Sequence, residues 1–236
     1  MRIVFMGTPE FAVPSLEGLV GAGHQLAGVF SQPDRPVGRH HNKLQPTPVK
    51  ERALAHGIPV YQPETLRDGT ALAILQELDP ELIVVAAYGR FLPDEILALP
   101  PRGCINVHSS LLPKYRGSAP INWAILNGER VTGVTIQRMV REMDAGDIIL
   151  QRSTPIGETE DAAALYDRLA RLGGELAVEA VAQIQAGTAT YTPQDHTRAT
   201  QAPMLSKAMS PVDWTRSAQE IFNQIRGLYP WPGAST

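Results

Sequence analysis

Apolar runs of strand length alternate with amphipathic segments along the first half of the chain. Arg2–Met6 and Leu82–Ala87 are almost continuous apolar runs, as expected for strands that are covered on both faces of a parallel sheet. Leu26–Ser31 is a third run of similar length. Because helical patterns separate these runs, the sequence predicts an α/β fold with a doubly wound, mostly parallel sheet and a Rossmann-like N-terminal half.

Proline, glycine and capping residues predict where the helices between these strands begin and end. Pro14 suits the first turn of a helix, and Gly21 and Gly23 would terminate that helix. Thr47 is expected to be an N-cap, with Pro48 at the first helical position after it. Ligands of such a sheet bind beyond the carboxyl ends of its strands, so a site is expected among the loops there.

The second half of the chain has a different pattern. Val131–Arg138 and Ile148–Thr154 have the composition of two strands joined by a turn, which predicts a mixed extension of the sheet. Thr159 is expected to cap a long helix, and the pair Gly173-Gly174 is expected to kink that helix.

Composition narrows the class of protein. A chain of 236 residues with 43% apolar content can bury a full core. The net charge of −3 means that any contact with nucleic acid must come from a local basic patch. The single Cys104 excludes an intramolecular disulfide framework and fits a reducing compartment. No apolar run approaches the roughly 20 residues of a membrane span, so a cytoplasmic protein is expected.

The most informative stretch of the sequence runs from Cys104 to Gly128. A short apolar strand carries Asn106 and His108 two residues apart, so both side chains leave the same face of a sheet. Asp144 follows in a later turn and adds a carboxylate to this amide and imidazole. Such a set suits proton transfer and oxyanion stabilisation in acyl transfer.

The common cofactor motifs are missing. The first turn, Gly7–Phe11, occupies the place of a dinucleotide fingerprint but lacks its glycine spacing. There is no phosphate-loop motif, and no paired Cys or His spacing suits zinc. A dinucleotide-binding module is therefore the weakest hypothesis for the function of the chain, and no metal is expected.

Several motifs along the chain share the order and spacing of one enzyme family. They are Asn106-Val107-His108, Ser110–Pro113, Tyr115-Arg116-Gly117, Pro120-Ile121 and Asp144, with the N-terminal Phe5–Phe11 and the loop Gln32–Gln45. With them, the chain resembles the 10-formyltetrahydrofolate-dependent formyltransferases, nearly from end to end. The loop narrows the resemblance to members that formylate the methionyl group of initiator tRNA for translation initiation. The rival reading is an amino-sugar N-formyltransferase with the same donor.

The resemblance implies a catalytic role for three residues. Asn106 would donate a hydrogen bond to the formyl oxygen as that oxygen becomes an oxyanion. His108 would move a proton between the incoming and leaving nitrogens. Asp144 would orient His108 or accept the proton of the amine through a water molecule. Neither a covalent intermediate nor a metal would be needed.

The resemblance also implies substrate contacts. Arg116 and Lys114 would either hold the acidic tail of the folate or face water. Contact with the tRNA acceptor end would come from Arg35, Arg39 and Lys43. The folate pocket would be lined by residues of three loops, namely Ser110, Leu111, Leu112, Pro113, Tyr88, Gly89, Arg90, Phe91, Leu92 and Val140.

Domain organisation is predicted in the same way. Residues 1–204 would form the catalytic domain. Thr192–Ala208 is polar and is expected to be a linker or crossing loop, and Trp214–Gly227 is expected to form one more helix. Residues 205–236 would be the linker, a helix and the first residues of a C-terminal tRNA-binding domain, so that the chain would be a shortened form. No obligatory protein partner is inferred.

Plainer alternatives remain for the same residues. Asn106 and His108 could be structural hydrogen-bonding groups at a strand end, and Asp144 could simply begin a turn. The loop Gln32–Gln45 could be a solvated surface loop without RNA contact. A non-catalytic folate-binding module is an alternative from another class, which the presence of all three catalytic residue types disfavours.

Overall fold

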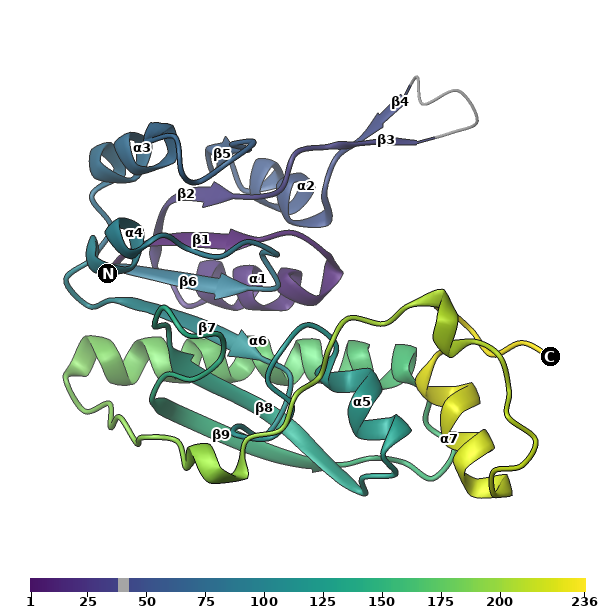
Figure 1. Ribbon diagram of the computed structural model, residues 1–236. Coiled ribbons are helices and arrows are strands. Elements are labelled where there is room, and N and C mark those ends of the chain that lie inside the picture. Colours follow the sequence, from purple (N-terminus) through teal and green to yellow (C-terminus); the bar gives the residue numbers. More distant parts are fainter. Residues whose placement is uncertain (38–42) are drawn as a thin grey trace.

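A seven-stranded sheet lies at the centre of the computed structural model, which describes residues 1–37 and 43–236 (Figure 1). The strand order is β5-β2-β1-β6-β7-β8-β9. All pairs from β5 to β7 are parallel, whereas β7 with β8 and β8 with β9 are antiparallel. The strands are β1 (Arg2–Gly7), β2 (Gln25–Phe30), β5 (Val60–Tyr61), β6 (Leu82–Ala86), β7 (Cys104–His108), β8 (Val131–Arg138) and β9 (Ile148–Pro155). The predicted mostly parallel α/β sheet is confirmed.

Helices cover both faces of the sheet, which explains the continuous apolar runs in its central strands. On β1, Ile3 and Phe5 pack into the core beneath α1 and α6, while Val4 and Met6 pack into the core beneath α3 and α4. All four are fully buried. The α-helices are α1 (Val13–Gly21), α2 (Pro48–Ala55), α3 (Thr70–Leu78), α4 (Asp94–Ala98), α5 (Pro120–Leu126), α6 (Ala162–Ala186) and α7 (Ala218–Gly227).

Short 3₁₀ turns complete the helical structure. They are η1 (Glu10–Ala12), η2 (His196–Arg198) and η3 (Lys207–Met209). Thr47 caps α2 as predicted, since its hydroxyl accepts a hydrogen bond from the backbone N–H of Lys50. Among the helices of residues 1–37 and 43–236, none combines the length and apolar composition required to cross a membrane.

Two helix starts differ from the sequence prediction. The N-cap of α6 is Asp161, whose carboxylate accepts a hydrogen bond from Ala164 N at 2.9 Å, so the prediction of Thr159 was wrong. Helix α7 begins at Ala218 rather than near Trp214, because Ser217 and Glu220 form a capping box there. In both caps a side-chain oxygen accepts a hydrogen bond from a free backbone N–H group. The geometry of this hydrogen bond determines which of several neighbouring polar residues becomes the N-cap.

Helix α6 runs through Gly173-Gly174 as one helix of 25 residues. The two glycines serve close packing. A Cβ atom on Gly174 would lie 2.7 Å from the backbone oxygen of Pro14 at the start of α1, and one on Gly173 would lie 2.8 Å from Val107 of β7. The absence of side chains at these positions therefore lets α6 lie directly against α1 and the sheet.

A two-stranded hairpin stands apart from the main sheet and projects away from it (Figure 1). It consists of β3 (Arg35–Val37) and β4 (Lys43–Gln45), which pair in antiparallel fashion. Arg35 is exposed on this hairpin. Arg39 lies outside the described residues, and of Lys43 only the backbone is described.

Gly174→Ala tests the close contact of α6 with α1. The added methyl group would meet the backbone of Pro14, which cannot move away as a flexible side chain could. We expect the free energy of unfolding to fall by about 1–3 kcal/mol despite the better helix propensity of alanine. The measurement is urea unfolding. Gly21→Ala is the matched control, since a Cβ there meets nothing within 4 Å. Equal stability of the two variants would contradict this packing.

Candidate active site

The carboxyl end of β7 carries two side chains that face the same cavity. Asn106 and His108 both line it, while the intervening Val107 points into the core beneath α6. This is the period-two alternation of a strand. His108 is buried, and the Asn106 amide makes no hydrogen bond with other side chains or backbone groups in the described part of the chain. A rigid strand thus presents one fixed imidazole and one available amide.

Asp144 reaches the same cavity from the loop between β8 and β9. Its Oδ1 lies 3.6 Å from Nδ1 of His108, with the side chains 13% and 6% exposed. The residue has a φ of 51°, a left-handed conformation that is uncommon outside glycine, asparagine and aspartate. The structure therefore brings together the three residues that the sequence analysis singled out as catalytic.

The hydrogen bond on the other side of the ring determines which nitrogen of neutral His108 carries the proton. Nε2 lies 2.9 Å from the backbone oxygen of Tyr115, and a carbonyl oxygen can only accept. Nε2 is therefore the protonated nitrogen. Nδ1, on the side of Asp144, is left as the nitrogen that can take up a further proton.

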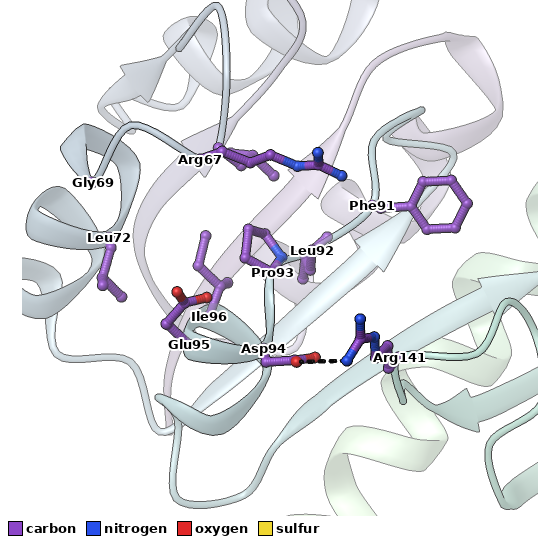
Figure 2. A pocket seen from close by; sticks show the side chains of 11 residues that line it. Arg67, Gly69, Leu72, Phe91, Leu92, Pro93, Asp94, Glu95, Ile96 and Arg141 are labelled. Atoms are coloured by element: carbon purple, nitrogen blue, oxygen red, sulfur yellow. Dashed lines mark ion pairs between the residues drawn. The ribbon is translucent and has the colours of Figure 1, made fainter.

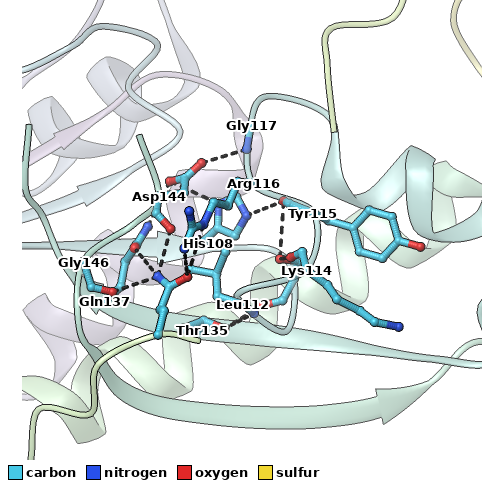
Figure 3. A network of polar contacts seen from close by, with 12 residues as sticks. His108, Leu112, Lys114, Tyr115, Arg116, Gly117, Thr135, Gln137, Asp144 and Gly146 are labelled. Carbon is cyan, nitrogen blue, oxygen red and sulfur yellow. Dashed lines mark hydrogen bonds and ion pairs between the residues drawn. The ribbon is translucent and has the colours of Figure 1, made fainter. Parts of the chain in front are cut away.

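The carboxylate of Asp144 is held by two hydrogen-bond donors (Figure 3). The backbone N–H of Gly117 donates to Oδ2 at 2.8 Å, and Nε2 of Gln137 donates to Oδ1 at 2.9 Å. Both donors come from other segments, namely the turn after β7 and the strand β8. Each oxygen of the carboxylate therefore has a hydrogen-bond donor from the protein.

The backbone on both sides of this contact depends on glycine. A Cβ atom on Gly146 would lie 1.8 Å from the backbone oxygen of Arg138, so the loop can be this tight only without a side chain there. Gly117 has a φ of 120°, and a Cβ on it would lie 2.7 Å from the backbone oxygen of Ala202. Both glycines are required by close backbone approach, which fixes where Asp144 and its N–H donor meet.

Gln194 supports the loop from behind and was missed by the sequence analysis. Its buried amide donates from Nε2 to the backbone oxygens of Asp144 at 2.8 Å and Gly146 at 2.7 Å. Its Oε1 accepts a hydrogen bond from Nη2 of Arg116 at 2.8 Å. Gln194 lies in the polar segment that was predicted to be a linker, and nothing in that composition distinguishes one buried glutamine from its exposed neighbours.

Arg116 neither faces water nor lines the cavity. It is only 6% exposed and donates from Nη2 to Nδ1 of His196 at 3.0 Å as well as to Gln194. Backbone hydrogen bonds join the same turn to the later segment, from Arg116 N to Thr200 O and from Ala202 N to Arg116 O. The segment that contains Gln194 is therefore hydrogen-bonded to the turn that forms part of the site. Lys114 is half-exposed and pairs with Glu129 at 3.2 Å.

The cavity in front of these residues has a volume of about 640 Å³. The amide, imidazole and carboxylate lie on its wall, and Val85, Leu97 and Met139 contribute apolar surface. Six of the ten predicted folate-contacting residues line it, namely Tyr88, Gly89, Arg90, Phe91, Leu92 and Val140. A mostly apolar cavity of this size with a few converging polar groups has the character of a small-molecule site.

The remaining four predicted folate-contacting residues, Ser110–Pro113, do not line the cavity. Ser110 is fully buried, and its hydroxyl donates to the backbone oxygen of Lys114 at 2.6 Å. The backbone N–H of Leu112 donates to the hydroxyl of Thr135 at 3.1 Å. This turn therefore packs beneath the site and holds the Tyr115 carbonyl that contacts His108.

The lone cysteine does not line the cavity. Cys104 lies at the start of β7, and burial raises the pKa of its thiol to about 12. The thiol is therefore protonated at neutral pH and is not a nucleophile. Among residues 1–37 and 43–236, no group of three or more metal-ligating side chains converges.

A second cavity of about 560 Å³ lies beside the first, between the loop before α3 and helix α4 (Figure 2). It shares Phe91, Leu92 and Arg141 with the first cavity. Asp94 pairs with Arg141 at 3.6 Å. None of the three converging polar groups lines this second cavity, so it is not the centre of the site.

Comparisons with known proteins agree with this geometry. The family model described as formyl transferase matches residues 1–181, and the one described as formyl transferase, C-terminal domain, matches residues 204–236. The chain is 53% identical over 236 residues to the methionyl-tRNA formyltransferase of Alkaliphilus oremlandii and 55% identical to that of Moorella thermoacetica. In both cases the match covers 100% of this chain and 76% of the relative.

Solved structures share the fold. A sugar N-formyltransferase from Shewanella matches with a TM-score of 0.76 at 19% identity, over 99% of this chain and 91% of that one. HypX from Aquifex aeolicus in complex with tetrahydrofolic acid matches with a TM-score of 0.74 at 20% identity, over 100% of this chain and 35% of that one. Identities this low support the fold alone.

Gln194→Leu tests the support behind the Asp144 loop. Leucine has a similar size but would leave the Arg116 guanidinium and two backbone oxygens without this buried partner. We expect a loss of about 2–4 kcal/mol in the free energy of unfolding, measured by urea denaturation. Gln201→Leu is the matched control in the same segment, because Gln201 is exposed. Unchanged stability of Gln194→Leu would show that the network does not support the loop.

Proposed function

Since this chain belongs to the family of methionyl-tRNA formyltransferases, we propose that it transfers the formyl group of 10-formyltetrahydrofolate to the α-amino group of methionyl-initiator-tRNA. The observation that carries the proposal is the convergence of Asn106, His108 and Asp144 on one cavity wall. The proposal includes a cytoplasmic location, because translation takes place there.

The cavity suits a folate-sized donor. Its volume falls within the range of roughly 300–1,000 Å³ that small-molecule sites occupy. The segment Tyr88–Leu92 and Val140 would contact the pterin ring, with backbone groups supplying hydrogen bonds and Leu97 and Met139 supplying apolar surface. Ser110–Pro113 would act indirectly, by shaping the turn beneath the site.

Asn106 would stabilise the developing charge. When the amino group attacks the formyl carbon, the formyl oxygen gains negative charge and becomes a better hydrogen-bond acceptor. The Asn106 amide is fixed on a strand and has no competing partner among the described residues, so it can donate to that oxygen without first breaking a contact. Such preorganised donors are among the largest contributions to catalysis of acyl transfer.

His108 and Asp144 would move the proton. Because Nε2 donates to the Tyr115 carbonyl, Nδ1 is the nitrogen that can accept the proton released by the attacking amine. The imidazolium so formed would have the Asp144 carboxylate 3.6 Å away. His108 could then return the proton to the leaving nitrogen of the folate, and no covalent enzyme intermediate is needed.

The β3–β4 hairpin is the proposed contact for the tRNA acceptor end. Arg35 is exposed on it, and the proposal extends to Arg39 and Lys43, which the sequence places in the same loop. Residues 1–204 would form the catalytic domain, and residues 205–236 the linker, helix and start of a tRNA-binding domain. Helix α7 packs against α5, with Nδ2 of Asn122 donating to Gly227 O at 2.7 Å.

A formylation assay tests the proposal against its rival. The protein is incubated with 10-formyltetrahydrofolate and either initiator methionyl-tRNA or nucleotide-linked amino sugars. We expect formylation of the tRNA-borne methionine alone. Formylation of the amino sugars instead would favour the amino-sugar N-formyltransferase, which the solved structures of similar fold make the natural alternative.

Asn106→Ala tests the oxyanion role. Removing one preorganised donor is expected to lower kcat by about 10²–10³ while leaving donor binding almost unchanged. The measurements are kcat for formylation and the dissociation constant of 5-formyltetrahydrofolate. Asn127→Ala is the control, because Asn127 contacts the hydroxyl of Tyr115 outside the cavity wall. A kcat of the wild-type size in Asn106→Ala would remove this residue from the mechanism.

Arg35→Ala tests the role of the hairpin. Loss of one phosphate contact should raise the KM for tRNA by roughly three- to tenfold and reduce the salt dependence of binding by about one counterion. The KM for the folate donor should stay the same. Arg171→Ala on α6 is the control, because this exposed arginine lies on a helix remote from the hairpin (Figure 1). Equal effects of both variants on the KM for tRNA would argue against a hairpin contact.

A further inference from the structure

A chain of hydrogen bonds, made by polar side chains and by the backbone oxygen of Gln32, connects the base of the β3–β4 hairpin to the loop that lines the donor cavity. We call it the bridge network. It consists of Gln32, Asp34, Lys50, Gln62 and Arg90. The reaction described above uses none of these contacts. The network therefore lies between the two proposed substrate sites.

The hairpin end of the bridge network is an ion pair. Nζ of Lys50 lies 2.5 Å from Oδ2 of Asp34, and the side chains are 23% and 18% exposed. Asp34 immediately precedes β3. The hydrogen bond from Lys50, with a second one from Gln62, lowers the pKa of Asp34. We call the residues next to β3 and β4 the two feet of the hairpin. The first foot, at Asp34, is thus held by a partly buried ion pair rather than by a solvent-exposed one.

The second foot is tied to the same place. Thr47 follows β4 by two residues and caps α2, the helix that carries Lys50. Its hydroxyl also lies 2.6 Å from the hydroxyl of Ser31, on the strand β2 side of the hairpin. The two feet of the hairpin therefore share one cluster of hydrogen bonds.

Gln62 forms the centre of the bridge network. Its Nε2 donates to Oδ1 of Asp34 at 2.6 Å and to the backbone oxygen of Gln32 at 2.8 Å, while its Oε1 accepts from Lys50 at 2.7 Å. One amide thus uses both donors and its acceptor to join the hairpin foot to the segment after β2. Gln62 itself does not line the donor cavity.

Gln32 completes the connection to the donor cavity. Its Nε2 donates to the backbone oxygen of Tyr88 at 3.2 Å, and its Oε1 accepts from Nε of Arg90 at 3.1 Å. Both Tyr88 and Arg90 line the cavity. The Thr8 hydroxyl donates to the same Tyr88 oxygen at 3.1 Å.

The cavity loop depends on such support because of its backbone conformation. Ala87 has a φ of 45° and Gly89 a φ of 81°, so Tyr88 lies between two residues in the left-handed region. An alanine in this region is strained, and such strain persists only where surrounding contacts fix it. The hydrogen bonds of Gln32 and Thr8 to Tyr88 supply that fixation.

We propose that Gln32 and Gln62 are positioning residues, which hold the donor-cavity loop and the foot of the hairpin in one relative placement. A substitution that removes the hydrogen bonds of Gln62, which lies outside the cavity, then makes the conformation of residues 87–92 less well fixed. Binding of the folate donor becomes weaker as a result. This inference rests on the proposed function, because it takes the cavity as the donor site and the hairpin as a tRNA contact.

The test compares Gln62→Leu and Gln62→Glu with the wild-type protein. Leucine removes all three hydrogen bonds, and glutamate keeps the acceptor for Lys50 but removes the donors to Gln32 and Asp34. The probe is 5-formyltetrahydrofolate alone, titrated calorimetrically well below the melting temperature. We expect its dissociation constant to rise about three- to tenfold in both variants. The KM for tRNA should rise as well, with a smaller change in kcat.

Two comparisons separate positioning from general stability. Glu179→Gln breaks an exposed ion pair with Arg152 at 2.6 Å and should leave the dissociation constant unchanged. The combined variant Gln32→Ala and Gln62→Leu should weaken donor binding by less than the product of the two single effects, because the residues act in one chain. A merely structural role would lower the melting temperature and leave the dissociation constant of the folded protein unchanged.

The outcomes distinguish this inference from the proposed function. Folded Gln62→Leu and Gln62→Glu proteins that bind the probe as tightly as the wild type would overturn the inference. Failure of the wild type to formylate methionyl-tRNA, with probe binding intact, would overturn the proposed function. The effect of the Gln62 variants on probe binding could still be measured and interpreted. Failure of the wild type to bind the probe would overturn both.

Discussion

The structure of the site depends on how one carboxylate is held. Asp144 is partly buried, and a charge in such a position needs donors of hydrogen bonds to compensate for lost water. Its donors come from the turn after β7 and from β8, and its backbone is held by Gln194 from a later segment. Formation of the site therefore requires that all these segments be in place.

The antiparallel end of the sheet makes this arrangement possible. A parallel strand is followed by a crossover that carries the chain away from the strand's carboxyl end. The antiparallel strand β8 instead runs back along β7 and ends at Arg138, beside Ile105 near the start of β7, and Gly146 permits a tight loop there. From this loop Asp144 reaches the face of β7 that carries Asn106 and His108, and its Oδ1 lies 3.6 Å from Nδ1 of His108. The departure from a purely parallel fold thus serves the chemistry.

Sequence patterns predicted the parts that depend on local periodicity and motif spacing. The apolar runs located the central strands, and the two-residue spacing of Asn106 and His108 placed both on one strand face. The buried role of Gln194 could not be predicted, because its segment has the composition of a linker and its burial results from contacts with Arg116 and the Asp144 loop. The position of Ser110–Pro113 beneath the site likewise depends on tertiary contacts with Thr135 and Gln151.

The late position of Gln194 in the chain has a consequence for biosynthesis. On the ribosome the chain emerges from its N-terminus, so residues 1–150 can form most of the sheet while the segment that supports the Asp144 loop is still unmade. Until then, Arg116 lacks its hydrogen bonds to Gln194 and His196. The loop that holds Asp144 therefore cannot be fully supported in a nascent chain until synthesis has passed this segment.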